Sequence, residues 1–243
     1  MKPENFKLKI EIYADGANLA EMMTMADNPR ISGLTTNPTL MRKAGIDNYS
    51  RFAKDVLKKI RDKPISFEVF SDDLLEMKMQ GIEIASWGEN VYVKVPITNT
   101  KGESTKEVIE YLVDKGVKVN VTAIFTVNQV REIVTALDPT IPSCLSIFAG
   151  RIADTGRDPI PLVQEVLKEI EGIPSIKLIW ASPRELLNIF QASEIGCHII
   201  TATSDILNKL EFIGKDLEEF SLETVKMFYL DALSSGYTIE ERP

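Results

Sequence analysis

The chain has 243 residues, of which 44% are hydrophobic and 26% charged, and its formal net charge is −8 at pH 7. This length is sufficient for a single large α/β domain, and the surplus of negative charge disfavours nucleic acid as the main partner. No segment approaches the roughly 18 consecutive apolar residues that a membrane helix requires, and the first residues lack the apolar run of a signal peptide. We therefore expect a soluble, cytoplasmic protein that does not bind membranes.

Cysteine and histidine are scarce. The two cysteines, Cys144 and Cys197, are too few for a disulfide framework and are typical of a reducing compartment. With His198 as the single histidine, the chain lacks the His and Cys clusters from which zinc sites are usually built. We expect the cysteines to fill the core, assign His198 no chemical role, and predict no metal site.

Short β-rich runs alternate with longer amphipathic segments along the chain, a pattern typical of parallel β/α units. Apolar residues at three- and four-residue steps predict helices between the runs, for example over 48–60, 105–115 and 161–171. A further amphipathic helix is predicted over about 216–235. The predicted strands start near Leu8, Ile31, Ile65, Val91, Lys118, Ser143, Ile176 and Cys197.

Two α/β folds fit this alternation. A doubly wound open sheet would normally carry a glycine-rich phosphate turn after its first strand, whereas Asp15-Gly16-Ala17-Asn18 contains one glycine. No low-complexity linker divides the chain. The sequence therefore predicts a single (β/α)₈ TIM barrel domain over residues 1–243, with an additional C-terminal helix that covers the barrel or reaches a neighbouring subunit.

A lysine lies within the fourth predicted strand, Val91-Tyr92-Val93-Lys94-Val95-Pro96. Lysine is depleted in strands, and the alternation of side chains puts Lys94 on the face opposite Val93 and Val95. The helix-facing side of a barrel strand is apolar, so we expect Lys94 to point into the lumen.

Other polar residues occur in or directly after the remaining strands. The carboxyl ends of all barrel strands converge on one mouth, where active sites lie, so we expect these residues to meet there. They are Asp15, Asn37, Ser66, Glu68, Asn120, Thr122, Ser146, Arg151 and Arg184.

Each of these residues also has a structural interpretation. A buried lysine, glutamate or asparagine in a strand can be a satisfied polar group of the core. Asp15 and Asn37 can be helix caps, and Arg184 can be an ordinary surface charge. The combination favours a functional site, because burying so many polar groups on one rim without use costs free energy.

The sequence resembles the transaldolases, in particular the short microbial branch that contains fructose-6-phosphate aldolase. The resemblance covers nearly the whole chain, with the motifs in family order and at family-like separations. These motifs are Thr35-Thr36-Asn37-Pro38-Thr39, Lys94-Val95-Pro96-Ile97-Thr98, Asn120-Val121-Thr122, Phe148-Ala149-Gly150-Arg151-Ile152 and Ser182-Pro183-Arg184.

The resemblance implies a covalent mechanism without a cofactor. Lys94 would attack a ketose carbonyl to form an imine (Schiff base), and carbon–carbon cleavage would leave a dihydroxyacetone carbanion delocalised into it. Lysine suits this role because burial can lower its pKa and free a nucleophilic amine. The resemblance implies that Asp15 removes the C4 hydroxyl proton and later returns it, while Glu68 and Thr122 handle a water during imine formation.

The resemblance also implies a binding set for small sugar phosphates. Its residues for the dihydroxyacetone hydroxyls are Asn37, Asn120 and Ser146, and Thr36 and Phe148 are further substrate-binding residues. Its residues for the phosphate are Arg151, Ser182 and Arg184. Members of this branch commonly form ring-based decamers in which the C-terminal helix packs on a neighbour, so we expect a homo-oligomer, with a decamer as one form.

Several positions depart from the family pattern around the mouth. Gly16-Ala17, Ile147 and Pro183 replace the usual residues, and the segment 201–204 lacks the usual prolines. These departures spare the implied catalytic set and leave the acceptor and the anionic group open.

Three hypotheses follow. The first is a transaldolase of the pentose phosphate pathway type. The second is an aldolase that releases free dihydroxyacetone, or a transferase acting on a modified sugar such as a sulfonated one. The third, a non-catalytic sugar-phosphate-binding barrel, would predict the loss of Lys94, Asp15 or Glu68, and all three are present. Free aldolases of this family are associated with glutamine and tyrosine where this chain has Glu68 and Phe148, which favours the transferase.

Overall fold

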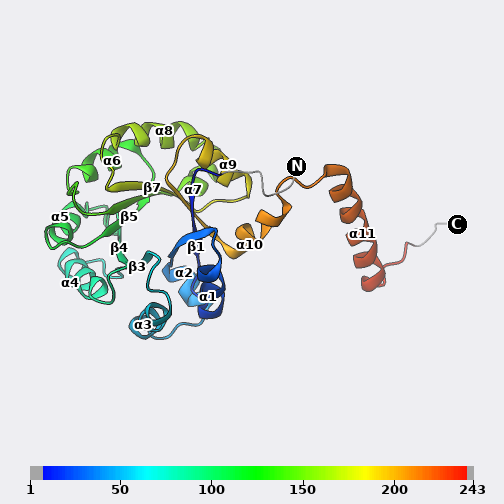
Figure 1. Ribbon diagram of the computed structural model, residues 1–243, viewed down its shortest axis with the longest axis horizontal. Helices are drawn as coiled ribbons and strands as arrows, with labels where there is room; N and C mark the ends of the chain where they lie inside the picture. Colours follow the sequence, from blue (N-terminus) through cyan, green and yellow to red (C-terminus); the bar gives the residue numbers. More distant parts are fainter. Residues whose placement is uncertain (1–7, 240–243) are drawn as a thin grey trace. The chain divides into compact units, whose positions relative to one another are not determined.

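The computed structural model describes residues 8–239, and within them eight parallel strands form a closed barrel in the order β1 to β8 (Figure 1). β1 pairs with both β2 and β8, which closes the sheet. The predicted α/β fold, a (β/α)₈ TIM barrel, is confirmed. The strands are β1 Glu11–Asp15, β2 Ile31–Thr35, β3 Ile65–Glu68, β4 Val91–Pro96, β5 Val119–Ile124, β6 Ser143–Ile147, β7 Ile176–Ala181 and β8 Ile199–Thr203.

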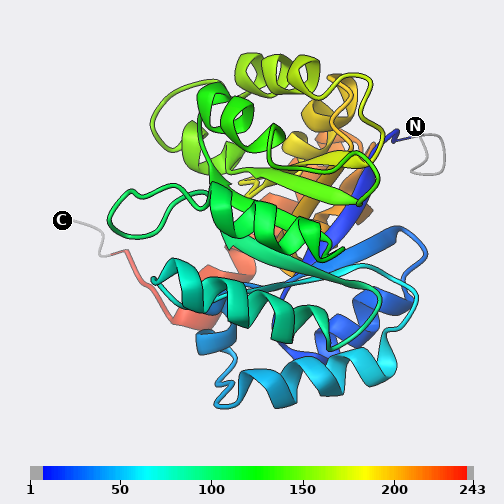
Figure 2. The same cartoon turned by 90° about the vertical axis from the view of Figure 1, so that its left-hand side faces the viewer.

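Helices follow the strands and flank the barrel on its outside (Figures 1 and 2). The helices predicted over 48–60, 105–115 and 161–171 correspond to α3, α5 and α8. The helices of the barrel unit are α1 Leu19–Asp27, α2 Pro38–Lys43, α3 Tyr49–Lys59, α4 Leu74–Ala85, α5 Lys106–Asp114, α6 Val127–Val134, α7 Ala149–Ala153, α8 Ile160–Glu169, α9 Leu187–Glu194 and α10 Ser204–Leu207.

Local sequence explains where many of these helices begin. The side chains of Asn18, Asn37, Asn48, Asp73 and Thr126 each accept a backbone N–H in the first turn of the helix that follows. Such caps satisfy donors that have no partner within the helix. The first strand is the exception to the predicted starts: it begins at Glu11 and not near Leu8, because its ladder with β8 starts at the pair Glu11 and Ile199.

An apolar cluster lies among strands β1, β6, β7 and β8 of the barrel. Tyr13, Cys144, Ile179, Ala181 and Ile199 pack together there, and all are buried. The Tyr13 ring fills the space in front of Gly33, where an added Cβ would lie 2.5 Å from a ring carbon, so glycine is required at that position. Burial raises the pKa of the Cys144 thiol to about 12, in keeping with a residue that fills the core.

The remaining cysteine and the histidine lie directly before β8. Cys197 is buried, and burial raises the pKa of its thiol to about 12. The Nδ1 atom of His198 accepts the backbone N–H of Leu178 at 3.1 Å, and burial lowers the pKa of the ring. Both residues therefore have structural contacts that account for their presence.

The described chain divides into two compact units, residues 8–208 with the barrel and residues 209–239. The second unit contains the predicted C-terminal helix, α11 Leu217–Ser235, which Asp216 caps and which ends at Gly236 with a left-handed φ of 67°. None of the residues of α11 is buried, although Phe228, Leu230 and other large apolar side chains lie along it. Among residues 8–239, no helix combines the length and hydropathy needed to cross a membrane.

Candidate active site

The register of the barrel brings three charged or amide side chains together on neighbouring strands. Glu68 at the end of β3 pairs with Lys94 in β4, and Lys94 pairs with Asn120 in β5. Because side chains alternate along a strand, residues paired across parallel strands face the same side. These three therefore share the lumen face, with Glu68 at the carboxyl end of β3, Lys94 inside β4 and Asn120 near the start of β5.

The Lys94 amine is enclosed, with 7% of the residue exposed. Its Nζ atom donates to the carbonyl oxygen of Thr36 at 2.6 Å and lies 3.3 Å from Oε2 of Glu68. Glu68 is therefore within reach to accept a proton from the amine or to return one. A buried amine beside one carboxylate is a suitable arrangement for a lysine nucleophile.

Tyr49 of α3 holds the strand end that carries this carboxylate. Its hydroxyl accepts the backbone N–H of Glu68 at 2.7 Å and donates to the carbonyl oxygen of Glu68 at 3.1 Å. The Tyr49 ring packs against Phe67, Phe70 and Trp87. Burial raises the pKa of Tyr49, so the hydroxyl keeps its proton and remains a donor.

Asp15 ends β1 and accepts two hydrogen bonds. Thr35 Oγ1 donates to Asp15 Oδ1 at 2.8 Å, and Asn37 Nδ2 donates to Asp15 Oδ2 at 3.1 Å. Although Asp15 keeps some exposed surface, burial of its carboxyl group is the largest influence on its pKa and raises it, while the charge of Lys94 and the two hydrogen bonds act in the opposite direction. A raised pKa suits a carboxyl group to returning a proton as well as removing one.

A second threonine extends this arrangement. Thr35 Oγ1 and Thr201 Oγ1 are 2.6 Å apart. The Thr35 hydroxyl has one proton and gives it to Asp15, so Thr201 is the donor in this contact. The resulting chain, from Thr201 to Thr35 to Asp15, fixes the orientation of the carboxylate from two neighbouring strands.

Asn120 is completely buried and links three strands. Its Nδ2 atom donates to Ser66 Oγ at 3.1 Å, and its Oδ1 atom accepts from Ser146 Oγ at 2.7 Å. Beside Lys94, this amide and these hydroxyls form a polar floor that can contact the hydroxyl groups of a bound ligand.

Thr122 lies two residues further along β5 and is buried. Next to it, Ala123 has a left-handed φ of 56°, and the ladder with β6 is interrupted between Val121 and Ile124. Bulges of this kind redirect side chains near active sites. Within residues 8–239, Thr122 forms no hydrogen bond with the other candidate residues.

The predicted anion-binding residues follow β6 and β7. The Arg151 guanidinium carbon lies 5.6 Å from the centroid of the Phe148 ring, which packs against the apolar cluster of β1, β6, β7 and β8. Arg184 Nη1 donates to both the carbonyl oxygen and the hydroxyl of Ser182, at 3.0 and 2.9 Å. Asp154 at the end of α7 forms an ion pair with Arg184.

Sequence reasoning did not assign several residues that contact the candidate set. Side-chain alternation in β2 and β8 was a usable signal for Thr35 and Thr201, because both fall on the lumen face. Tyr49 and Asp154 lie on helices, and no strand pattern indicates their contacts.

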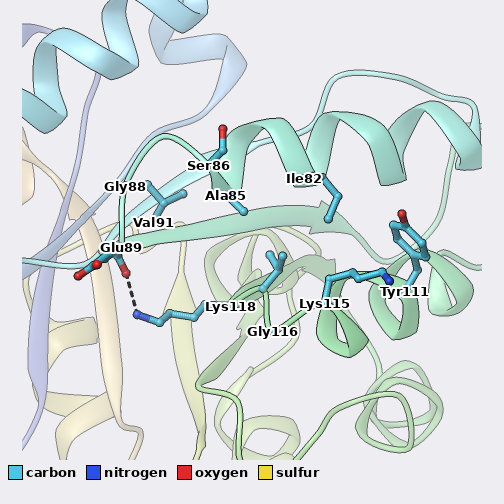
Figure 3. A pocket seen from close by; sticks show the side chains of 11 residues that line it. Ile82, Ala85, Ser86, Gly88, Glu89, Val91, Tyr111, Lys115, Gly116 and Lys118 are labelled. Carbon is cyan, nitrogen blue, oxygen red and sulfur yellow. Dashed lines mark hydrogen bonds between the residues drawn. The ribbon is translucent and has the colours of Figure 1, made fainter.

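A hollow of about 560 Å³ lies away from this mouth, between α4 and α5 near the amino ends of β4 and β5. Figure 3 shows Tyr111, Lys115 and Lys118 around it, with Lys118 Nζ donating to the carbonyl oxygen of Glu89. None of the candidate residues lines this hollow. No group of three or more His, Cys, Asp or Glu residues in the described chain is arranged to hold a metal ion.

The chain is similar to known proteins in sequence. A family model described as Transaldolase/Fructose-6-phosphate aldolase matches residues 12–238. A protein of Dehalococcoides mccartyi named "Probable transaldolase" is 32% identical over 202 residues, which cover 83% of this chain and 90% of the relative. A protein of Desulforamulus reducens with the same name is 32% identical over 220 residues, which cover 89% of this chain and 97% of the relative.

A solved structure is similar in fold. The crystal structure of 2,3-dimethylmalate lyase, a member of the PEP mutase/isocitrate lyase superfamily, matches with a TM-score of 0.53 and 13% identity, covering 99% of this chain and 88% of that chain. At this identity the similarity concerns the fold alone.

Proposed function

Because the chain belongs to the transaldolase/fructose-6-phosphate aldolase family, we propose that it transfers a dihydroxyacetone unit from a ketose phosphate to an aldose phosphate through an imine on Lys94. The observation that carries this proposal is the Lys94 amine, buried in the lumen at 3.3 Å from the Glu68 carboxylate. An enzyme of this class needs one enclosed amine and one group that can exchange protons with it.

In the proposed reaction, Lys94 Nζ attacks the ketose carbonyl carbon, and Glu68, with Thr122, moves the protons that allow water to leave. Asp15 then removes the proton of the C4 hydroxyl, the C3–C4 bond breaks, and the electron pair passes into the imine. The aldehyde product leaves and an acceptor aldehyde enters. Asp15 returns the proton as the new bond forms, and water releases the product from Lys94.

The surroundings of Asp15 and Asn120 support these roles. Burial raises the pKa of the Asp15 carboxyl group, and Lys94 is close enough for its charge to act in the opposite direction. Asn37 donates a hydrogen bond to Asp15, and the carbonyl oxygen of Thr36 accepts one from Lys94. We assign Thr36, Asn37, Asn120, Ser146 and Phe148 to binding the dihydroxyacetone unit, and no cofactor is required.

We further assign the anionic end of the sugar to Arg151, Ser182 and Arg184. Replacing Arg151 with alanine is expected to raise KM for a phosphorylated ketose about tenfold or more with little change in kcat, because it removes charge-assisted hydrogen bonds made in both ground and transition states. Arg184→Ala should act in the same direction. Steady-state kinetics with phosphorylated and unphosphorylated donors measures the effect.

The exposed Arg61 donates to the carbonyl oxygen of Lys58 and offers the control. Arg61→Ala should leave KM unchanged for both phosphorylated and unphosphorylated donors. An equal rise in KM for phosphorylated and unphosphorylated donors would contradict the assignment of the anion site.

Transfer is proposed to dominate over release of free dihydroxyacetone. Phe148 has no hydroxyl that could place a water or deliver the proton needed for release, so the imine-bound carbanion should persist until an aldehyde arrives. We expect Phe148→Tyr to raise the rate of release relative to transfer. The test compares dihydroxyacetone release from fructose 6-phosphate alone with transfer to erythrose 4-phosphate.

The neighbouring ring provides a matched control for this comparison. Phe125 lies 5.9 Å from Phe148, centroid to centroid, and is more exposed. Phe125→Tyr adds a hydroxyl at the same rim and should leave the ratio unchanged. Release as fast as transfer in the unaltered protein would favour the aldolase alternative, and a panel of donors that includes sulfonated ketoses tests the modified-sugar alternative.

We also propose that the protein is a cytoplasmic homo-oligomer, with a decamer as one form, acting in the pentose phosphate pathway. The exposed apolar residues of α11 support association, since 60% or more of Val225, Phe228, Tyr229, Leu230 and Leu233 is accessible in the single chain. Light scattering measures the assembly.

A further inference from the structure

Arg184 has little free hydrogen-bonding capacity. A guanidinium has five N–H donors. The Nε–H of Arg184 donates to Asp154 Oδ1 at 2.9 Å, Nη2 pairs with Asp154 Oδ2, and Nη1 donates to the carbonyl oxygen and hydroxyl of Ser182 at 3.0 and 2.9 Å. One N–H of Nη2 is left without a partner among these contacts. The Nε and Nη2 edge, which could bind an anion with two hydrogen bonds, is already paired with the Asp154 carboxylate.

The backbone around this contact is tightly placed. A Cβ added to Gly150 would lie 1.6 Å from the carbonyl oxygen of Ser182, so α7 approaches the end of β7 as closely as glycine allows. Ser182 itself has a left-handed φ of 60°. Asp154 is attached to the same helix, since its N–H donates to the carbonyl oxygen of Gly150 at 3.0 Å. The carboxylate that holds Arg184 is thus anchored to α7.

Arg151 differs from Arg184. It belongs to α7, whose C-cap is Asp154, and its guanidinium carbon lies 5.6 Å from the centroid of the Phe148 ring. Within residues 8–239, the Arg151 side chain forms no hydrogen bond or ion pair. The hydrogen bond from Arg184, together with the charges of both arginines, lowers the pKa of the Asp154 carboxyl group, so Asp154 is ionised at neutral pH.

We propose that Asp154 is the positioning residue of the anion site. By holding the Nε and Nη2 edge of Arg184, it fixes that guanidinium against Ser182 and leaves Arg151 as the arginine whose donors are free to grip a phosphate. Arg184 then contributes its charge and one N–H. This inference deepens the proposed function and rests on it, because it concerns how the same site holds the anionic end of the sugar.

The test uses Asp154→Asn and Asp154→Glu in the whole 243-residue chain. Asparagine offers one oxygen acceptor and one NH₂ group, and the NH₂ group cannot accept a hydrogen bond from the guanidinium. The two-pronged contact is therefore lost. We expect inorganic phosphate to bind about tenfold more weakly to Asp154→Asn in isothermal titration calorimetry. KM for a phosphorylated ketose should rise by the same factor with kcat little changed, and Asp154→Glu, which keeps the carboxylate, should recover most of the loss.

Glu165→Gln is the matched control, since Glu165 is likewise a surface carboxylate paired with an arginine, Arg131, at 3.0 Å. It should bind phosphate as the unaltered protein does. Unchanged or tighter phosphate binding by a folded Asp154→Asn, or no phosphate binding by the unaltered protein, would overturn the inference. If Asp154→Asn fails to fold, Asp154→Glu decides: binding tenfold weaker than in the unaltered protein would oppose the inference. Failure of borohydride to trap an adduct would contradict the proposed function. Phosphate binding does not require the imine, so the two tests can fail independently.

Discussion

Replacement of Lys94 with alanine is expected to abolish transfer, with a loss of at least about 10⁴-fold in kcat, because the covalent route has no other nucleophile. Borohydride added with a ketose phosphate should trap a covalent adduct on the unaltered protein and none on Lys94→Ala. Peptide mass mapping locates the adduct. We expect the adduct on Lys94 because its amine is buried in the lumen between Thr36 and Glu68.

The fold should survive this replacement. Lys94 contributes backbone pairing to β3 and β5, which alanine retains, and its side chain occupies a lumen position. Circular dichroism should therefore show an unchanged barrel. Lys118→Ala serves as the control, because Lys118 contacts Glu89 away from the mouth and should keep both turnover and trapping. An adduct mapped to another lysine would remove the proposed mechanism.

Replacement of Asp15 with asparagine is expected to lower kcat by about 10² to 10⁴-fold, the usual contribution of a general acid–base group. The amide has nearly the shape of the carboxyl group but cannot take the C4 hydroxyl proton. Imine formation does not need that proton, so borohydride trapping at Lys94 should persist in Asp15→Asn. A variant that loses trapping together with turnover would place Asp15 in imine formation and contradict its assigned role.

The pH dependence gives a second measure of the same carboxylate. Thr35 donates to Asp15, which stabilises the ionised form, so Thr35→Val should raise a pKa that burial already raises. A general base is active when ionised. The acid limb of the kcat/KM profile should therefore move to higher pH in Thr35→Val, and a limb that stays in place or moves to lower pH would show that Asp15 does not control it.

The sequence by itself determined the order of the elements and the face on which most candidate side chains lie. The period of two along a strand is a local property, so the alternation in Val91–Pro96 is enough to separate Lys94 from the apolar face formed by Val93 and Val95. The same period places Glu68 and Asn120. Helix caps such as Asn48 are also local, because the side chain contacts a backbone N–H three residues away.

The tertiary structure alone decided which groups touch. The hydroxyls of Thr35 and Thr201 are separated by 166 positions in sequence and meet only because β1 lies between β2 and β8 in the closed barrel. Asp154 and Arg184 meet because α7 packs against the end of β7, a contact made possible by Gly150. Side-chain periodicity carries no information on such approaches, since they depend on the register between strands and the packing of helices, which are set by the whole chain.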